Sequence, residues 1–153
     1  DGAEDWAEYA EQYKLELSYH IHSDSIVDSL EEWRTYMSFL NKAKLCIDVS
    51  HAAYWDFDPV ESIREFRDQL NYVHLQDWKG PMYSDDGKDK RAWCPVGEGN
   101  ACDFAAILSV LQEINYDRWV TAVPGIPNPG RADALSMAQE SKSMHGYMRS
   151  MGY

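Results

Sequence analysis

The sequence predicts an α/β fold in which parallel strands form a sheet and helices lie outside it. Short apolar segments with strand character alternate with segments whose apolar residues recur at helical spacing, so the order reads β-α-β-α-β-α-β-α. The length of 153 residues is typical of one domain, which we expect to cover residues 1–153. Hydrophobic residues make up 44% of the chain and aromatic residues 13%, a composition that argues against intrinsic disorder.

Local patterns place the elements in chain order. Residues 5–12 are typical of the end of a helix. Strands are predicted over residues 14–22, 43–49, 71–76 and 118–123. Helices are predicted over residues 28–42, 58–70, 103–115 and 131–148. The helix over 103–115 has the clearest pattern, because Asp103 can cap it and its apolar stripe is regular: Phe104, Ile107, Leu108, Leu111 and Ile114.

Two stretches are predicted as loops. Residues 77–101 are rich in Gly, Asp, Lys and Pro, and the segment GIPNPG (125–130) is rich in turn-forming residues. A loop as long as 77–101 in a compact domain is usually functional or mobile. We therefore expect the loop 77–101 to border a site.

Charge and cysteine content limit the classes of partner and compartment. The formal net charge of −12 argues against nucleic acid or an anionic membrane as the main partner. No apolar run approaches the length of a membrane span, and the acidic start DGAEDWAEYAEQ does not resemble a signal peptide. The three cysteines lack zinc-ribbon spacing and fit a reducing cytoplasm, and Cys46 is interpreted as a small core residue. The predicted location is cytoplasmic.

Polar side chains follow three successive predicted strands. The first strand ends in YHIHSD, the second in IDVSH and the third in HLQD, which together supply His20, His22, Asp24, Asp48, His51, His74 and Asp77. Ligands of parallel α/β folds bind at the carboxyl ends of the strands. A lone histidine at a strand end more often has only a hydrogen-bonding role, but three adjacent strands that end alike favour a shared site. Imidazole and carboxylate groups together suit a divalent metal, which can polarise a carbonyl and stabilise an enediolate.

Four quoted segments carry a resemblance to a known family. LSYHIH, LCIDVSHA, NYVHLQD and PVGEGNACDFAAILSVLQEINYDRWV resemble, in this order, the second half of a xylose isomerase-like TIM barrel. That superfamily contains sugar and sugar-phosphate isomerases and epimerases, inosose dehydratase and related lyases. The resemblance implies four βα units that correspond to the second half of a (β/α)8 barrel, with parallel strands and outer helices.

The resemblance also implies roles for single residues. Members commonly hold a divalent metal (Mn, Co, Zn or Mg), and the matching ligand positions here are His20, Asp48 and His74. His51, the companion of Asp48 in the D-x-x-H motif, is expected to touch substrate or metal. The bases considered for proton transfer are His22, His51 and Asp77. Substrate contacts are expected from His51, Trp55, Trp78 and Lys79, although the tryptophans could equally serve loop packing.

Two departures from the family pattern keep alternatives open. The glutamate usual on the fifth barrel strand is His20 here, and the one usual on the eighth strand is Val123, so both members of the common glutamate pair are absent. The leading hypothesis is a metal-dependent sugar, sugar-phosphate or inositol isomerase, epimerase or dehydratase that acts next to a carbonyl. The alternative is a catalytically degenerate binding or assembly protein of the same fold, and a metal-dependent phosphoesterase is disfavoured.

The expected fold also bears on partners. A full barrel needs about 250 residues and eight units. Four units alone would expose two strand edges and the apolar interior of the barrel. We therefore expect a homodimer, pairing with a first-half chain, or a piece of a longer protein, with a small sugar-like molecule as substrate.

Overall fold

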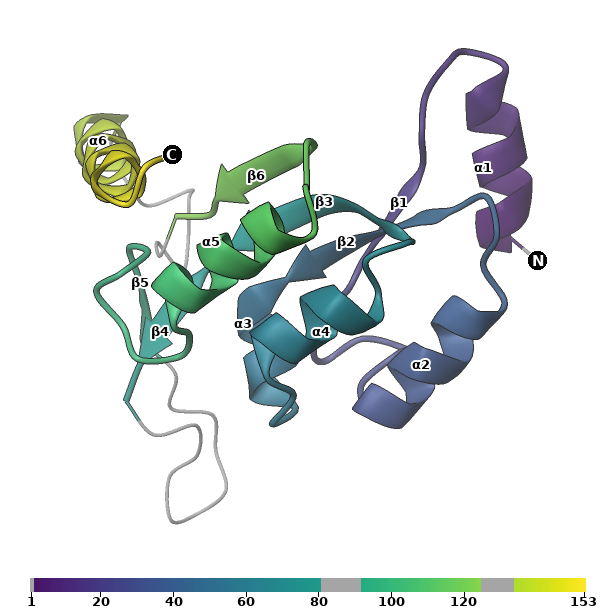
Figure 1. Cartoon of the computed structure of the whole chain (residues 1–153), viewed down its shortest axis with the longest axis horizontal. Helices are drawn as coiled ribbons and strands as arrows, with labels where there is room; N and C mark the ends of the chain where they lie inside the picture. Colours follow the sequence, from purple (N-terminus) through teal and green to yellow (C-terminus); the bar gives the residue numbers. More distant parts are fainter. Residues whose placement is uncertain (1, 81–91, 125–133) are drawn as a thin grey trace.

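A parallel four-stranded sheet forms the centre of the molecule (Figure 1). The computed structural model describes residues 2–80, 92–124 and 134–153. The strands lie in the order β1-β2-β3-β6, which is their order in the chain: β1 (Ser18–His20), β2 (Lys44–Asp48), β3 (Leu70–Leu75) and β6 (Trp119–Ala122). Consecutive parallel neighbours joined through helices are the arrangement of successive units in a barrel. The predicted α/β fold with a parallel sheet is confirmed.

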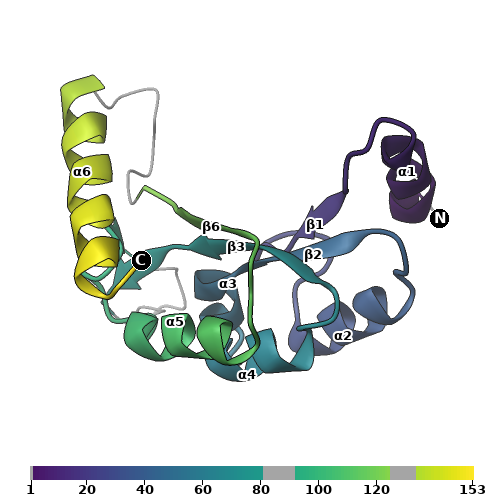
Figure 2. The ribbon, with the colours of Figure 1, turned by 45° about the horizontal axis from the view of Figure 1, so that its top comes forward.

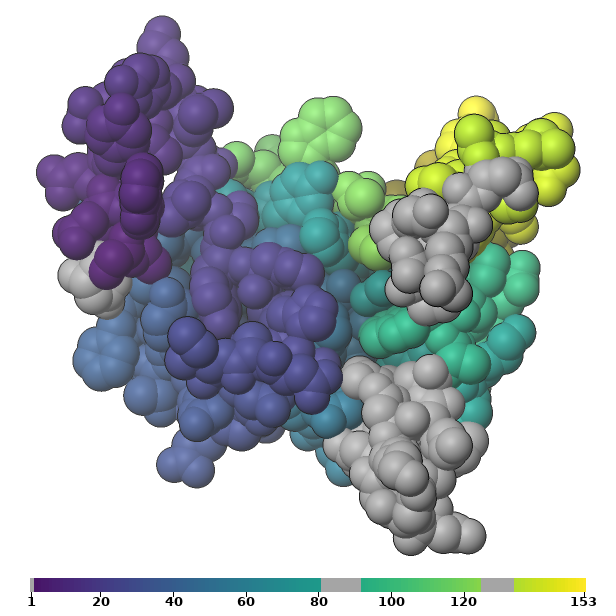
Figure 3. Space-filling view, turned by 180° about the vertical axis from the view of Figure 1, so that it is seen from behind, coloured from purple at the N-terminus to yellow at the C-terminus, as the bar shows by residue number. Residues whose placement is uncertain are grey.

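Helices cover one face of this sheet. Figure 2 shows helices beneath the strands, while the first and last helices stand at the two ends of the sheet. The helices are α1 (Gly2–Glu11), α2 (Leu30–Ser38), α3 (Val49–Tyr54), α4 (Pro59–Glu65), α5 (Phe104–Glu113) and α6 (Ala134–Ser150). We call the opposite face of the sheet the open face. Figure 3 looks onto that side, where parts of β3 and β6 (teal and green) show between the N-terminal segment (purple) and α6 (yellow).

Strand alternation separates the core from the open face. Leu45 and Ile47 of β2 and Val73 and Leu75 of β3 are completely buried and belong to the core. Residues two apart share a strand face, so the intervening positions of both strands lie on the open face. The same period therefore places apolar side chains against the helices and polar ones on the other side.

Two of the outer segments meet across the open face. The guanidinium of Arg118, just before β6, donates a hydrogen bond of 2.6 Å to the carboxylate of Glu16, just before β1. These strands are the two edges of the sheet, so the sheet curves around its open face. Trp119 of β6, in register with Tyr72, lies on this face with 74% of its surface exposed.

Several helices begin directly after a residue whose side chain caps the first turn. The side chains of Ser29, Asp48, Asp58 and Asp103 each accept a backbone N–H from the first turn of the helix that follows. The predicted cap Asp103 is thus confirmed. No helix among the described residues is long and apolar enough to cross a membrane.

Some predicted boundaries were wrong. The first strand was predicted over 14–22, but β1 covers only Ser18–His20, because β2 begins at Lys44 and offers partners only from there. The short helix α3 directly after β2 was not predicted. The predicted loop 77–101 contains an antiparallel pair, β4 (Asp77–Lys79) and β5 (Ala92–Cys94). Residues 81–91 of that loop, the segment GIPNPG (125–130) and residues 131–133 of the last predicted helix lie outside the described residues.

Candidate functional site

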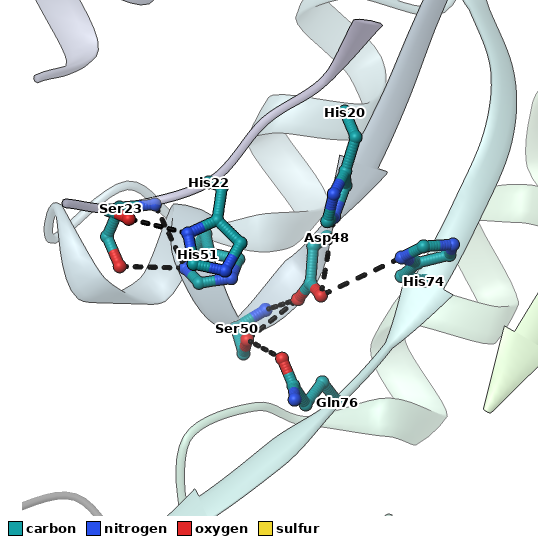
Figure 4. Close-up of polar contacts among 8 residues, drawn as sticks. All are labelled: His20, His22, Ser23, Asp48, Ser50, His51, His74 and Gln76. Carbon is teal, nitrogen blue, oxygen red and sulfur yellow. Dashed lines mark hydrogen bonds and ion pairs between the residues drawn. The ribbon is translucent and has the colours of Figure 1, made fainter. Parts of the chain in front are cut away.

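His20, Asp48 and His74 gather at the carboxyl ends of three neighbouring strands (Figure 4). Asp48 and His74 are paired in register across β2 and β3. Oδ2 of Asp48 lies 3.8 Å from Nε2 of His20 and 4.0 Å from Nδ1 of His74. The structure therefore brings the three predicted metal ligands together on the open face.

The local fold fixes the orientation of Asp48. Its Oδ1 accepts hydrogen bonds from the backbone N–H of Ser50 at 3.0 Å and from the Ser50 hydroxyl at 2.7 Å. Because Oδ1 caps α3 in this way, Oδ2 is turned toward the two histidines. Burial opposes ionisation of Asp48, but His20, the charge of His51 and the two Ser50 donors hold the pKa of its carboxyl below the usual range. The carboxylate is therefore an anion at neutral pH.

His74 presents a neutral imidazole to this carboxylate. Burial and the like charge of His20 lower the pKa of His74, against the opposing attraction of Asp48. Its Nδ1 is buried and has no hydrogen-bond partner among the described residues. A buried polar atom without a partner costs free energy, and a ligand bound at this atom would remove that cost.

The donor set fits a divalent metal. Ligand atoms that share an ion at ~2.0–2.2 Å lie roughly 3–4 Å from one another, and the contacts of Asp48 Oδ2 fall in this range. Imidazole nitrogens and a carboxylate oxygen suit zinc, cobalt or manganese. A cation bound there would also satisfy the buried Nδ1 of His74. The metal role of His20, Asp48 and His74 stays a prediction that this geometry supports.

Cys46 lies beside the same cluster. It shares a strand face with Asp48, two residues away, and is in register with His20 of β1. Its Sγ and one nitrogen each of His20 and His74 all lie within 4.8 Å of one another. Burial and the nearby Asp48 raise the pKa of its thiol to about 12. The interpretation of Cys46 as a core residue matched its 3% exposure but missed which face of the sheet it occupies.

Ser23 orients two further histidines. Its backbone N–H donates to Nδ1 of His51 at 3.1 Å, and its hydroxyl lies 2.9 Å from the same atom. An atom that accepts from an N–H carries a lone pair, so a neutral His51 has its proton on Nε2. Nδ1 of His22 lies 2.6 Å from the Ser23 carbonyl and must donate to it, which leaves the lone pair of His22 on Nε2. The two rings lie 4.0 Å apart between centroids, His22 exposed and His51 buried.

Asp77 occupies a different environment from the histidines. Its carboxylate accepts four backbone N–H groups, those of Trp78, Gly97, Gly99 and Ala101, at 2.9–3.2 Å. It is 1% exposed. A carboxylate that accepts four hydrogen bonds has its oxygen lone pairs already engaged by the backbone. Its predicted role as a base remains a prediction, and these contacts favour a structural role in tying β4 to residues 97–101.

The glycines of this segment have physical reasons to be glycine. A Cβ at Gly99 would collide with the Asp77 carboxylate and the Trp78 carbonyl. Gly97 has a φ of +87°, and a Cβ there would overlap the ring of Tyr147 in α6. The sequence GEG at 97–99 thus serves the Asp77 turn and the packing of α6.

The predicted substrate-contact residues do not form one group. Trp55 is half-buried and donates its indole N–H to Asp28 at 3.4 Å, Trp78 is 6% exposed, and Lys79 is exposed. Trp93, paired with Trp78 across β4 and β5, lies with its ring centroid 6.1 Å from that of His51. The sequence-based substrate contacts included Trp55 and Trp78 but not Trp93, because its place beside His51 depends on the β4–β5 pairing. The fifth histidine, His145, is exposed on α6, as expected.

A model of the xylose isomerase-like TIM barrel family matches residues 1–143. The chain is 27% identical over 152 residues to inosose dehydratase of Geobacillus kaustophilus (strain HTA426), covering 93% of this chain and 49% of the relative. It is 26% identical over 143 residues to inosose dehydratase of Clostridium beijerinckii, covering 84% of this chain and 48% of that one. The chain spans about half the length of the curated relatives it matches.

Solved structures show the same fold. The probable 3-DHS dehydratase AsbF from Bacillus anthracis superposes with a TM-score of 0.69 at 14% identity, covering 94% of this chain and 54% of that chain. A D-psicose 3-epimerase superposes with a TM-score of 0.71 at 16% identity, covering 98% of this chain and 54% of that chain. At such identities the likeness concerns the fold alone. Both neighbours extend well beyond the part that this chain matches.

Proposed function

This chain belongs to the xylose isomerase-like TIM barrel family, and from that premise we propose that it contributes the metal-binding half of a sugar or inositol dehydratase. The observation that carries the proposal is the cluster of His20, Asp48 and His74, with the partnerless buried Nδ1 of His74 at its centre. The curated relatives cited above are inosose dehydratases, which favours loss of water next to a ketone over isomerisation or epimerisation. That the reaction is a dehydration and not an isomerisation or epimerisation is part of what we propose.

The three predicted metal ligands serve one step of the proposed reaction, the activation of the ketone. His20, Asp48 and His74 would hold a divalent ion, which would supply a Lewis acid for the ketone oxygen and for the negative charge that develops on it. Asp48 is held ionised and His74 neutral, so both offer lone pairs without first losing a proton. Ser50 keeps the carboxylate in place, and its hydroxyl also reaches the amide oxygen of Gln76 at 3.3 Å. These contacts restrict the orientation of the ligands before substrate arrives.

His22 is the proposed proton-moving residue. Its Nδ1–H is tied to the Ser23 carbonyl, so its exposed imidazole carries the accepting lone pair on Nε2. It removes the proton from the carbon next to the ketone, and the C–H electron pair forms the enediolate. The enediolate then expels the hydroxyl from the neighbouring carbon, and the protonated His22 returns its proton to that group. Water leaves and an unsaturated ketone remains, with His22 restored.

Buried neighbours support His22 rather than react. The His51 ring lies tilted against the His22 ring, 4.0 Å between centroids, and is fixed by Ser23, so it restricts the orientation of His22. Trp93 lies beside His51 and offers an aromatic face to a polyol ring. We assign the substrate contact to Trp93 in preference to Trp78, which is buried.

A specific observation favours the second candidate, a sugar-binding protein without turnover. Val123 follows β6 and donates its backbone N–H to Leu75 at 2.7 Å, so an aliphatic side chain occupies the position where relatives of the resembled family carry a glutamate. A reaction that needs two bases on opposite faces of the substrate loses one of them. A dehydration in which a single base removes and returns the proton does not need the second.

The open face requires a covering structure in the active protein. The exposed Trp119 and a hollow of about 570 Å³ lie at the amino-terminal end of this face. We propose that four further βα units cover it, supplied by a second copy, by a first-half chain or by further residues of a longer protein. Light scattering of the purified chain tests this part: a dimer, or a complex with an added first half, supports it, and a well-folded monomer that binds no first half contradicts it.

Turnover tests the reaction itself. The chain is purified with and without the complementary half of the G. kaustophilus relative, loaded with manganese, cobalt or zinc, and incubated with an inosose. We expect loss of one water per substrate, seen by mass spectrometry and as a vinyl proton by NMR. Binding of the inosose by calorimetry without product supports the second candidate. Exchange of the proton next to the ketone without loss of water would instead indicate epimerase or isomerase chemistry.

A further inference from the structure

We propose that Cys46 is a fourth protein ligand of this metal site and that its thiolate makes the site prefer zinc and cobalt over manganese and magnesium. The inference rests on the proposed metal-dependent function of the same site. It adds a sulfur ligand, which the sequence reading did not assign and which changes the class of metal that the site selects.

The backbone places the thiol where a ligand is needed. Cys46 is in register with His20 on one side and Tyr72 on the other, and it precedes Asp48 by two residues on the same strand face. The sulfur and one nitrogen from each of His20 and His74 lie within 4.8 Å of one another. Strand pairing holds these positions, so the thiol needs no backbone movement to approach the cluster.

The chemistry of the donor set then decides the metal. Two imidazoles, one carboxylate and one thiolate form a nitrogen, oxygen and sulfur set of the kind that zinc adopts with four-coordinate geometry. Manganese and magnesium prefer oxygen-rich sets, whereas the soft thiolate favours zinc and cobalt. The two glutamate positions of the resembled family hold His20 and Val123 here, so oxygen donors are few and a sulfur donor stands close by.

Binding of the metal ion to the Cys46 sulfur releases one proton. The S–H bond breaks, the sulfur electron pair binds the ion, and one proton passes to the buffer. No oxidant or reductant takes part. The other two cysteines provide matched controls, because they lie outside the cluster: Cys94 is buried in β5, and Sγ of Cys102 contacts the backbone carbonyl of Val49 at 3.6 Å.

Cobalt is the probe of choice, because thiolate binding adds an intense near-ultraviolet charge-transfer band to its weaker visible bands. The metal-free chain is titrated with cobalt as wild type, C46S, C46A and the C94S/C102S double variant. We expect the charge-transfer band in wild type and in the double variant, and its loss in C46S and C46A. Zinc affinity should fall more than tenfold in C46S, since even partners outside the ligand shell cost ~10–100-fold, and manganese affinity should change little.

The outcomes separate this inference from the proposed function. Visible cobalt bands without a charge-transfer band in wild type leave the metal site standing and overturn the role of Cys46. No cobalt binding at all overturns both. If the Cys46 variants fail to fold, X-ray absorption of the zinc-loaded C94S/C102S protein decides: a sulfur neighbour at ~2.3 Å supports the inference, and a shell of nitrogen and oxygen alone refutes it.

Discussion

Nδ1 of His74 lies 4.0 Å from Oδ2 of Asp48, across two strands that pair these residues in register. The distance is too long for a hydrogen bond, yet both groups are largely shielded from solvent, with Asp48 1% exposed. The two atoms face each other without sharing a proton. A cation between them would bind both as ligands.

His74→Ala should remove metal binding. The substitution deletes a nitrogen ligand supplied by β3, and the ligands that remain on β1 and β2 hold an ion more weakly. We expect the metal content of protein purified without chelator to fall from about one ion per chain to a small fraction of that, as measured by inductively coupled plasma mass spectrometry. His145→Ala on α6 is the matched control and should leave the content unchanged. Retained stoichiometry in H74A would take this residue out of the site.

His22→Asn should separate proton transfer from metal binding. The asparagine amide can still donate to the Ser23 carbonyl in place of Nδ1–H, but it has no equivalent of Nε2. Turnover should fall by ~10²–10⁴-fold, the usual contribution of a general base, with the metal content unaltered. Loss of the metal in this variant would show instead that His22 is a ligand, and unchanged turnover would assign the proton to another group.

Asp77→Asn should destabilise the fold and leave the metal site intact. An amide has one acceptor oxygen, so two of the four backbone donors lose their acceptor, at roughly 1.5 kcal/mol each or more. The expected loss is about 3 kcal/mol in the free energy of unfolding by urea. Asp68→Asn, with its carboxylate side chain 91% exposed, serves as the control and should change little. Normal stability with abolished turnover would restore Asp77 as a catalytic base.

Acidification should lower the free energy of unfolding of the metal-free protein. The pKa of His74 is lowered from 6.5, so below that pH the unfolded chain takes up a proton that the folded chain resists, and stability falls. The pKa of Asp48 is also lowered, so its contribution is present above the ordinary carboxyl pKa and is lost as the pH drops through the folded value. Urea midpoints in chelator should therefore decrease from neutral pH downward. His74→Gln should show a shallower decrease just below neutral pH, and an identical slope in H74Q would contradict the assigned shift.

Much of the fold could be predicted from the sequence, because apolar residues recur at different spacings in its helices and in its strands. The stripe on α5 and the alternation along β3 predicted a helix and a strand that the structure contains. The β4–β5 pair escaped prediction, because its strands are three residues each and their partners are separated by a polar segment. Helix α3 escaped because Asp48 ends a strand and caps a helix with the same side chain.

The site was predicted less completely than the fold. Strand-end position indicated a wider group of histidines and carboxylates, because parallel strands bring their carboxyl ends to one edge. The family resemblance then singled out His20, Asp48 and His74 as the metal ligands. Cys46 was assigned to the core because burial was inferred from its apolar neighbours, although its spacing of two from Asp48 carried the information about its face. Ser23 and the Asp77 turn could not be predicted, since they depend on backbone N–H groups whose directions no side-chain pattern encodes.

Anomalous diffraction from a crystal of the chain loaded with zinc or cobalt tests the central claim most directly. Data collected on either side of the metal absorption edge locate the ion without reference to activity, and so the result does not depend on how the open face is covered. The account predicts one anomalous peak within bonding distance of Asp48 Oδ2 and of ring nitrogens of His20 and His74. A peak elsewhere, or none in protein shown to be folded and saturated with the ion, would contradict it.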